Sequence, residues 1–153
     1  MQNMFIIINA VLFLFLVICA VTDIRHKEIY LKVLIPFAIA GLILFIIYRP
    51  VSIFEEILGI MTGLVFIGLW AISDGKIGLG DALLMTVTGI FKGGRENAGL
   101  IMTAMLMSAV YSIYCLAAKK ADRHTKFAFA PFILISFIIM TLCGFIGSKG
   151  GIL

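Results

Sequence analysis

Charged side chains are scarce in this chain. Lys, Arg, Asp and Glu together make up 13% of its 153 residues, about half the share of roughly 25% that soluble domains carry. Apolar residues account for 63% before the 15 glycines are counted. A chain of this size has too high a surface-to-volume ratio to bury so many apolar side chains in one core. Much of its surface must therefore face lipid, which predicts an all-α integral membrane protein.

The chain also lacks the marks of several other classes of protein. Its cysteines, Cys19, Cys115 and Cys143, are scattered through apolar runs without C-x-x-C or Cys/His spacing. We interpret them as small buried hydrophobes, and we expect no disulfide, no metal and no cofactor. The net charge of +4 comes from short loops rather than one basic face, so nucleic acid is not an expected partner. With no linker or low-complexity tract, residues 1–153 are predicted to form a single polytopic domain.

Six apolar segments lie between the polar breaks, at 4–21, 33–48, 57–73, 77–91, 98–118 and 127–146. Because about 20 helical residues cross ~30 Å of hydrocarbon, we expect about six transmembrane helices. The fourth segment contains three glycines and covers only about 22 Å at ~1.5 Å per residue, so it is expected to be short or irregular. Irregular backbone at membrane depth persists only where protein or a water-filled cavity covers it, which draws functional attention to this segment.

The basic residues predict the orientation. If the N-terminus is outside, the cytoplasmic loops hold eight Lys and Arg residues and the outer loops hold four, which agrees with the cytoplasmic excess of basic residues in membrane proteins. We therefore expect both termini outside. The expected cytoplasmic residues are Arg25, Lys27, Lys32, Lys76, Lys119, Lys120, Arg123 and Lys126, and the outer ones are Arg49, Lys92, Arg95 and Lys149.

Two of the eight acidic residues fall outside the predicted loops. Six fall in predicted loops, where we expect solvation or, for Asp122, a surface ion pair. These six are Glu28, Glu55, Glu56, Asp74, Glu96 and Asp122. Asp23 directly follows the first span, and Asp81 lies inside the fourth segment. An acid that faces lipid costs about 2.5–3.5 kcal/mol at a helix centre, so both should face protein or water, at the same depth near the cytoplasmic interface.

Two carboxylates at equal depth in a partly dry site are the parts of an aspartyl protease. Such a pair shares one proton and titrates as a unit. The ionised member takes a proton from water, and the protonated member donates to the scissile carbonyl. The alternative is that Asp23 pairs with Arg25 or Lys27 while Asp81 caps the fourth helix. The residues alone leave both interpretations open.

Three stretches resemble motifs of one family. Gly-Leu-Gly-Asp at 78–81 resembles the GxGD motif of intramembrane aspartyl proteases. Asp-Ile-Arg at 23–25, followed by Ile29, resembles the first-aspartate motif of the type IV prepilin peptidases, and 127–132 is similar to the Pro-Phe-Gly-Pro-Phe motif that opens their last helix. The chain thus resembles a minimal prepilin peptidase, similar also to preflagellin peptidases, over nearly its whole length.

The resemblance implies an aspartic endopeptidase that removes a short basic leader from prepilin-like precursors at the cytoplasmic face of the inner membrane. Asp23 and Asp81 would be catalytic, without a metal or cofactor. The expected partners are the bilayer and a precursor with a basic leader and a hydrophobic helix. The residues expected to position the substrate are Gly78, Gly80, Phe129, Pro131 and Phe132.

The chain also departs from the family pattern. Leu83 stands where the family usually has Lys, Tyr30-Leu31 replaces Pro-Asn, and Ala128 and Ala130 stand where Pro and Gly are common. The larger members carry a methyltransferase region with paired cysteines, so here we expect peptidase activity without N-methylation. The functions left open are a preflagellin-type peptidase, a proton-relay transporter subunit and an inactive assembly component.

Overall fold

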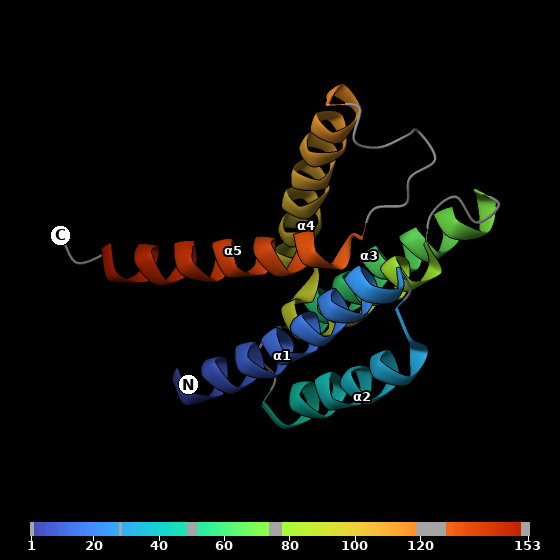
Figure 1. The fold of residues 1–153 in the computed structure, drawn as a ribbon. Coiled ribbons are helices and arrows are strands. Elements are labelled where there is room, and N and C mark those ends of the chain that lie inside the picture. The colour runs from blue at the N-terminus through green and yellow to red at the C-terminus, as the bar shows by residue number, and fades with distance from the viewer. Residues whose placement is uncertain (1, 28, 49–51, 74–77, 119–127, 151–153) are drawn as a thin grey trace.

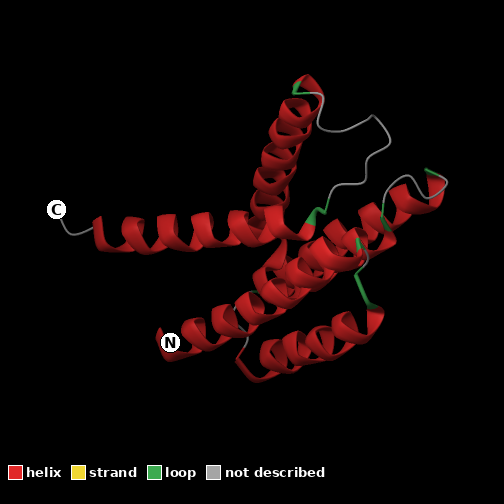
Figure 2. Ribbon diagram, viewed as in Figure 1, coloured by secondary structure: helices red, strands yellow, loops and turns green. Residues whose placement is uncertain are grey.

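The fold is helical throughout the part that the computed structural model describes, which is residues 2–27, 29–48, 52–73, 78–118 and 128–150. These ranges form five helices and no strand, and their arrangement can be followed in Figures 1 and 2. They are α1 (Gln2–His26), α2 (Leu31–Tyr48), α3 (Ile53–Ile72), α4 (Leu79–Ala117) and α5 (Ala130–Gly150). The all-α expectation is confirmed for these residues.

Four of these helices, α1 to α4, are long and apolar enough to cross a membrane. The shorter apolar part of α5 is Ala130–Gly144. Large apolar side chains on the helices are widely exposed, among them Phe54, Ile72 and Val110. A surface of this kind is unfavourable in water and favourable in lipid, so the fold supports a multi-pass membrane protein.

The described part of the chain does not support the expected count of six spans. The fourth and fifth predicted segments, 77–91 and 98–118, belong to one element, α4, in which Gly93 alone has non-helical backbone angles (φ 73°, ψ 174°). The positive φ lets a single glycine redirect the chain, so no loop was needed between the two segments. Lys92 and Arg95, expected in an outer loop, therefore lie in helix on either side of this break.

A buried amide holds the two halves of α4 together across the break. Asn97 is fully buried, and its Nδ2 donates to the Met85 carbonyl (3.1 Å) and to Thr62 Oγ1 of α3 (2.9 Å). Thr88 Oγ1 donates to Asn97 Oδ1 (2.8 Å). In a straight helix, residues nine positions apart lie about 13 Å apart along the axis, so these bonds require the second half of α4 to bend back toward the first.

Small residues let α3 pack closely on the first half of α4 (79–92). A Cβ at Gly59 would overlap the Gly89 carbonyl, and a Cβ at Gly63 would overlap Thr86. Close approach through small residues is the usual way in which membrane helices associate. The apolar core lies between α1, α4 and α5, and its fully buried members include Leu12, Phe15, Leu16, Leu84, Leu100 and Ile133.

The acidic residues of α3 differ from the expectation of solvated loops. Ser52 caps the helix by accepting from the Glu55 N–H (3.2 Å), so Glu55 and Glu56 lie in its first turn. Glu56 is only 4% exposed, and its carboxylate oxygens have no hydrogen-bond partner in the described structure. It is buried because α3 starts earlier than predicted, which places Glu56 on the helix face that carries Gly59 and Gly63. The expected solvation of Glu56 is therefore wrong.

The other acidic residues that were expected in loops differ in their contacts. Glu55 Oε2 accepts from the Arg95 backbone N–H (3.0 Å), so it joins α3 to α4. Glu96 is exposed and forms an ion pair with Lys92 (3.1 Å). Glu28, Asp74 and Asp122 lie outside the described residues.

Candidate active site

Asp23 and Asp81 line the same cavity, which has a volume of about 290 Å³. It lies where α1 ends and α4 begins, and the segment that joins α1 to α2 closes one side. Its lining residues are Asp23, Lys27, Ile29, Leu31, Gly78, Leu79, Gly80, Asp81 and Leu83. The volume has room for several water molecules at about 30 Å³ each. The structure thus brings together the two carboxylates and both glycines that the sequence singled out.

Asp23 is held by the start of the last helix. It sits in the final turn of α1, is 5% exposed, and its Oδ2 accepts a hydrogen bond from the Ala130 backbone N–H (2.8 Å). Ala130 is the first residue of α5, and the first N–H groups of a helix lack partners within the helix. The positive end of the α5 dipole also favours a carboxylate at this place. Asp23 therefore acts as a cap for a helix 107 positions further along the chain.

Asp81 lies in the first turn of α4. The residue at the N-cap is Gly78, and no side chain caps this helix end. In the described structure, Asp81 therefore does not cap this helix, although the alternative interpretation expected it to. Asp81 is half-buried and faces the cavity that Asp23 also lines.

The two glycines before Asp81 have different neighbours. A Cβ on Gly78 would lie 2.9 Å from Asp81 Oδ2, so a side chain there would push on the carboxylate itself. A Cβ on Gly80 would lie 2.9 Å from the Cβ of Ile29, in the segment between α1 and α2. Gly78 thus leaves space for the carboxylate, and Gly80 lets α4 pack against that segment.

Phe129 and Phe132 of the last-helix motif lie outside the cavity lining. Phe129 packs against the core, and its carbonyl accepts from the Phe132 N–H in the first turn of α5 (3.0 Å). The Phe132 ring is 5.5 Å from the Tyr111 ring, centroid to centroid, and lines a separate apolar groove on α4. Pro131 is half-buried in the first turn of α5, where a missing N–H costs nothing. Phe127 lies outside the described residues.

Sequence reasoning missed Lys27 as a cavity residue. It follows α1 with a positive φ of 54°, and its N–H donates to the Asp23 carbonyl (2.8 Å). The signal was present, because the residue that ends a helix commonly adopts the left-handed conformation and turns the chain back. Without a fold, however, nothing showed that this turn would bring Lys27 to the cavity that Asp81 also lines.

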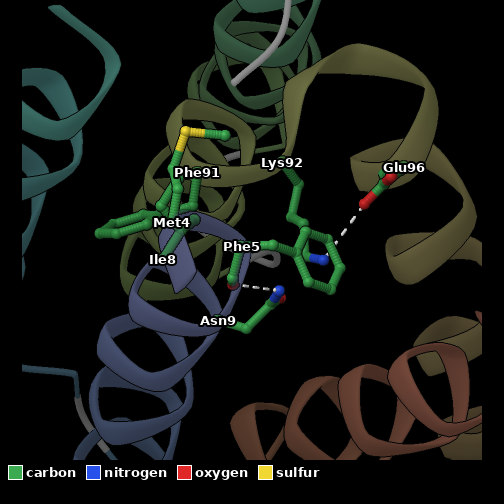
Figure 3. Close-up of a pocket in the computed structure, with 7 residues that line it drawn as sticks. All are labelled: Met4, Phe5, Ile8, Asn9, Phe91, Lys92 and Glu96. Atoms are coloured by element: carbon green, nitrogen blue, oxygen red, sulfur yellow. Dashed lines mark hydrogen bonds and ion pairs between the residues drawn. The ribbon is translucent and has the colours of Figure 1, made fainter. Parts of the chain in front are cut away.

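A second, smaller cavity of about 90 Å³ lies at the other end of α1 (Figure 3). Lys92 is drawn there between Glu96 and the Phe5 ring, and only 11% of its side chain is exposed. Its Nζ lies 5.7 Å from the centroid of the Phe5 ring and 5.3 Å from that of Phe137. Cation–π contacts of this kind stabilise a partly dehydrated ammonium. This end of the molecule therefore carries an ion pair, and the other end carries the two aspartates.

The chemistry available at the aspartate cavity is that of two carboxyl groups beside one ammonium. In the described ranges, no three His, Cys, Asp or Glu side chains gather closely enough to hold a metal ion. A carboxylate and a neighbouring carboxylic acid can together accept a proton from water and donate one to a carbonyl oxygen.

Comparison with known proteins finds similarity to leader peptidases. Residues 10–148 match the model of the type IV leader peptidase family. The prepilin leader peptidase/N-methyltransferase of Bacillus subtilis (strain 168) is 30% identical to the chain over 134 residues. That alignment covers 84% of this chain and 52% of the relative, so the chain spans about half the length of this curated relative. No solved structure matches the chain.

Proposed function

The chain belongs to the type IV leader peptidase family, and from that premise we propose that it is an aspartic-type endopeptidase in which Asp23 and Asp81 activate water. The proposed reaction removes a short basic leader from a prepilin-like precursor. The proposed partners are this precursor, with its hydrophobic helix, and the surrounding bilayer.

The observation that carries the proposal is the shared cavity. Asp23 comes from the end of α1 and Asp81 from the start of α4, yet both line one space that is large enough for water. Acids at the ends of apolar helices usually snorkel toward bulk water or pair with surface cations. Asp23 is instead buried and bonded to a backbone N–H, which fixes one carboxylate in place.

The proposed reaction uses the pair as base and acid. The ionised carboxylate takes a proton from a water molecule, whose oxygen attacks the carbonyl carbon of the scissile peptide bond. The carboxylic acid donates its proton to the carbonyl oxygen, which gives a neutral tetrahedral intermediate. The intermediate collapses as the C–N bond breaks. The leaving nitrogen takes the proton that the first carboxylate had accepted from water, and the second carboxylate takes a hydroxyl proton from the intermediate, so the pair returns to its starting state.

The proposal includes the side of the membrane on which the reaction occurs. Arg25, Lys27 and Lys32 lie at the aspartate end, between the last turn of α1 and the first turn of α2. Such a cluster of basic residues favours the cytoplasmic face, where an unprocessed leader would be available. We also propose that the chain does not N-methylate its product, since its three cysteines lie singly.

The direct test is to replace Asp23 and Asp81 singly by Asn and to co-express each variant with a candidate prepilin. Asn keeps the shape of Asp but cannot take up the proton. We expect each variant to accumulate normally and to lose cleavage by at least about 100-fold, the usual contribution of general acid–base catalysis. Glu96→Gln is the matched control, because Glu96 is exposed and lies at the opposite end of α1 from the aspartates.

Normal cleavage by either Asn variant would contradict the proposal. The transporter alternative predicts another result, in which both variants lose ion flux while the length of the precursor never changes. The gel mobility of the precursor and a proton-flux assay on reconstituted vesicles separate the two functions.

A further inference from the structure

Lys27 has a backbone conformation that is unusual for its residue type. It is the only non-glycine residue with a positive φ in the described part of the chain, at 54°. The left-handed region is strained for an L-residue with a side chain, and glycine enters it freely. This position therefore has a side chain where the backbone alone would favour glycine.

The conformation places Lys27 at the cavity. Its N–H makes the last helical bond of α1, to the carbonyl of Asp23 (2.8 Å), and the chain then turns toward Ile29 and α2. Lys27 becomes part of the same cavity lining as Asp23 and Asp81. A residue whose side chain is costly to the backbone thus lines the cavity that holds the two carboxylates.

Among the described residues that line the cavity, Lys27 is also the only cation. Two of the nine are acidic, and the other six are glycine or apolar, including Leu83 of α4. Opposite charges interact more strongly in a partly buried cavity than in bulk water. One ammonium beside two carboxylates partly offsets the repulsion between them and favours one charge state and arrangement of the pair.

We propose that Lys27 is a positioning residue for the Asp23/Asp81 pair, whose ammonium fixes the arrangement and charge of the two carboxylates. The inference rests on the proposed function. It assigns Lys27 no contact with the substrate, so its removal lowers kcat and leaves KM unchanged.

The variants separate the effect of the Lys27 ammonium on activity from the effect of its left-handed backbone on stability. Lys27→Gly removes the ammonium and relieves the left-handed backbone, so we expect an unchanged or higher melting temperature together with a kcat on the order of 10- to 100-fold lower. Lys27→Met keeps the backbone cost and the stem but removes the charge, and it should lose the same activity. Lys27→Arg, which keeps the charge, should retain most of the activity.

The decisive variant moves the positive charge to another helix. Leu83 lines the same cavity from α4, so Lys27→Gly combined with Leu83→Lys returns an ammonium to the cavity from a different helix. We expect this double variant to recover most of the kcat that Lys27→Gly loses. A role in ending α1 predicts no such recovery, because the second change lies far from that turn in sequence.

Several results would overturn the inference. Wild-type kcat in both Lys27→Gly and Lys27→Met would show that the ammonium is not needed, while the loss of cleavage in the Asp23 and Asp81 variants would leave the proposed function standing. A raised KM at unchanged kcat would make Lys27 a substrate contact instead. A lower melting temperature in Lys27→Gly, without recovery in the double variant, would make its role structural. A wild-type chain that cleaves no prepilin would overturn the proposed function, and this inference with it.

Discussion

At the scale of single residues, Gly78 and Gly80 show how one short motif serves two purposes. The missing Cβ of Gly78 leaves room for the Asp81 carboxylate, and that of Gly80 leaves room for Ile29. A carboxylate at the end of a side chain can move aside, whereas the Cβ of Ile29 is tied to the backbone. The two glycines should therefore respond differently to the same substitution.

We expect Gly78→Ala to lower activity with little change in stability. The added methyl would lie 2.9 Å from Asp81 Oδ2, so the carboxylate must shift, and misplacing a catalytic group by up to about 1 Å costs on the order of 10- to 100-fold in rate. The measurements are leader cleavage and thermal unfolding in detergent. Gly68→Ala is the control, since a Cβ there meets nothing within 4 Å. Full activity in Gly78→Ala would show that the carboxylate does not need this space.

Glu56 is the residue whose environment departs most from the sequence expectation. Its burial without a hydrogen-bond partner contrasts with Glu55, which accepts from the Arg95 N–H. Adjacent positions on a helix face different directions, so one acid of the pair reaches a partner and the other is enclosed. From the sequence, both glutamates were expected to be solvated in the same loop.

At the scale of elements, α4 is the helix that determines where Asp81 lies. Its first half (79–92) carries Asp81 and packs on the glycines of α3, and its second half (94–117) contacts α5 through the Ser136 Oγ donor to the Leu100 carbonyl (2.9 Å). Gly93 allows the turn between the halves, and Asn97 fixes its direction. The position of Asp81 relative to Asp23 thus depends on an amide that lies far from both.

We therefore expect Asn97→Leu to destabilise the protein by about 2–4 kcal/mol. Leu has a similar size, but it removes the three buried hydrogen bonds of the amide, to Thr88, Thr62 and Met85, and each is worth about 0.5–1.5 kcal/mol. Thermal or denaturant unfolding in detergent measures the change. Thr103→Val is the control, since the Thr103 hydroxyl donates to the Gly99 carbonyl of its own helix. Equal stability of the two variants would show that the network does not hold the halves of α4.

At the scale of the whole molecule, the two ends of α1 have different chemistry. The aspartate cavity, with Arg25, Lys27 and Lys32 nearby, lies at its C-terminal end, and the Lys92–Glu96 pair lies at its N-terminal end. A helix of 25 residues is about 37 Å long at ~1.5 Å per residue, enough to separate these ends by the thickness of a bilayer. The two ends should therefore face opposite sides of the membrane.

Labelling with a membrane-impermeant maleimide tests this arrangement. In a variant whose three native cysteines are replaced by alanine, we expect Arg95→Cys to react in intact cells and Lys32→Cys to react only after the membrane is opened. Both residues are exposed, so accessibility to the reagent depends on the side of the membrane. The reverse pattern would invert the proposed orientation, and labelling of both in intact cells would contradict a spanning α1.

Much of the site was predictable because its signals are local. The rarity of charge made Asp23 and Asp81 conspicuous, and Gly78 and Gly80 directly precede one of them. The positions of Phe129, Pro131 and Phe132 were less predictable from the motif. The start of α5 reaches Asp23 through a backbone N–H, that of Ala130. Every residue except proline has this group, so no side chain marked that contact.

Local sequence was enough to predict the apolar, helical character of the described residues and the two aspartates at helix ends, because hydropathy and helix periodicity are sums over neighbouring residues. The tertiary structure alone decided that Asp23 and Asp81 share a cavity, that Lys27 lines it, that one glycine joins two predicted spans, and that Glu56 is buried. Each of these depends on contacts between segments far apart in sequence. Such contacts follow from how helices pack, through close glycine contacts and a buried amide, and no local pattern encodes that packing.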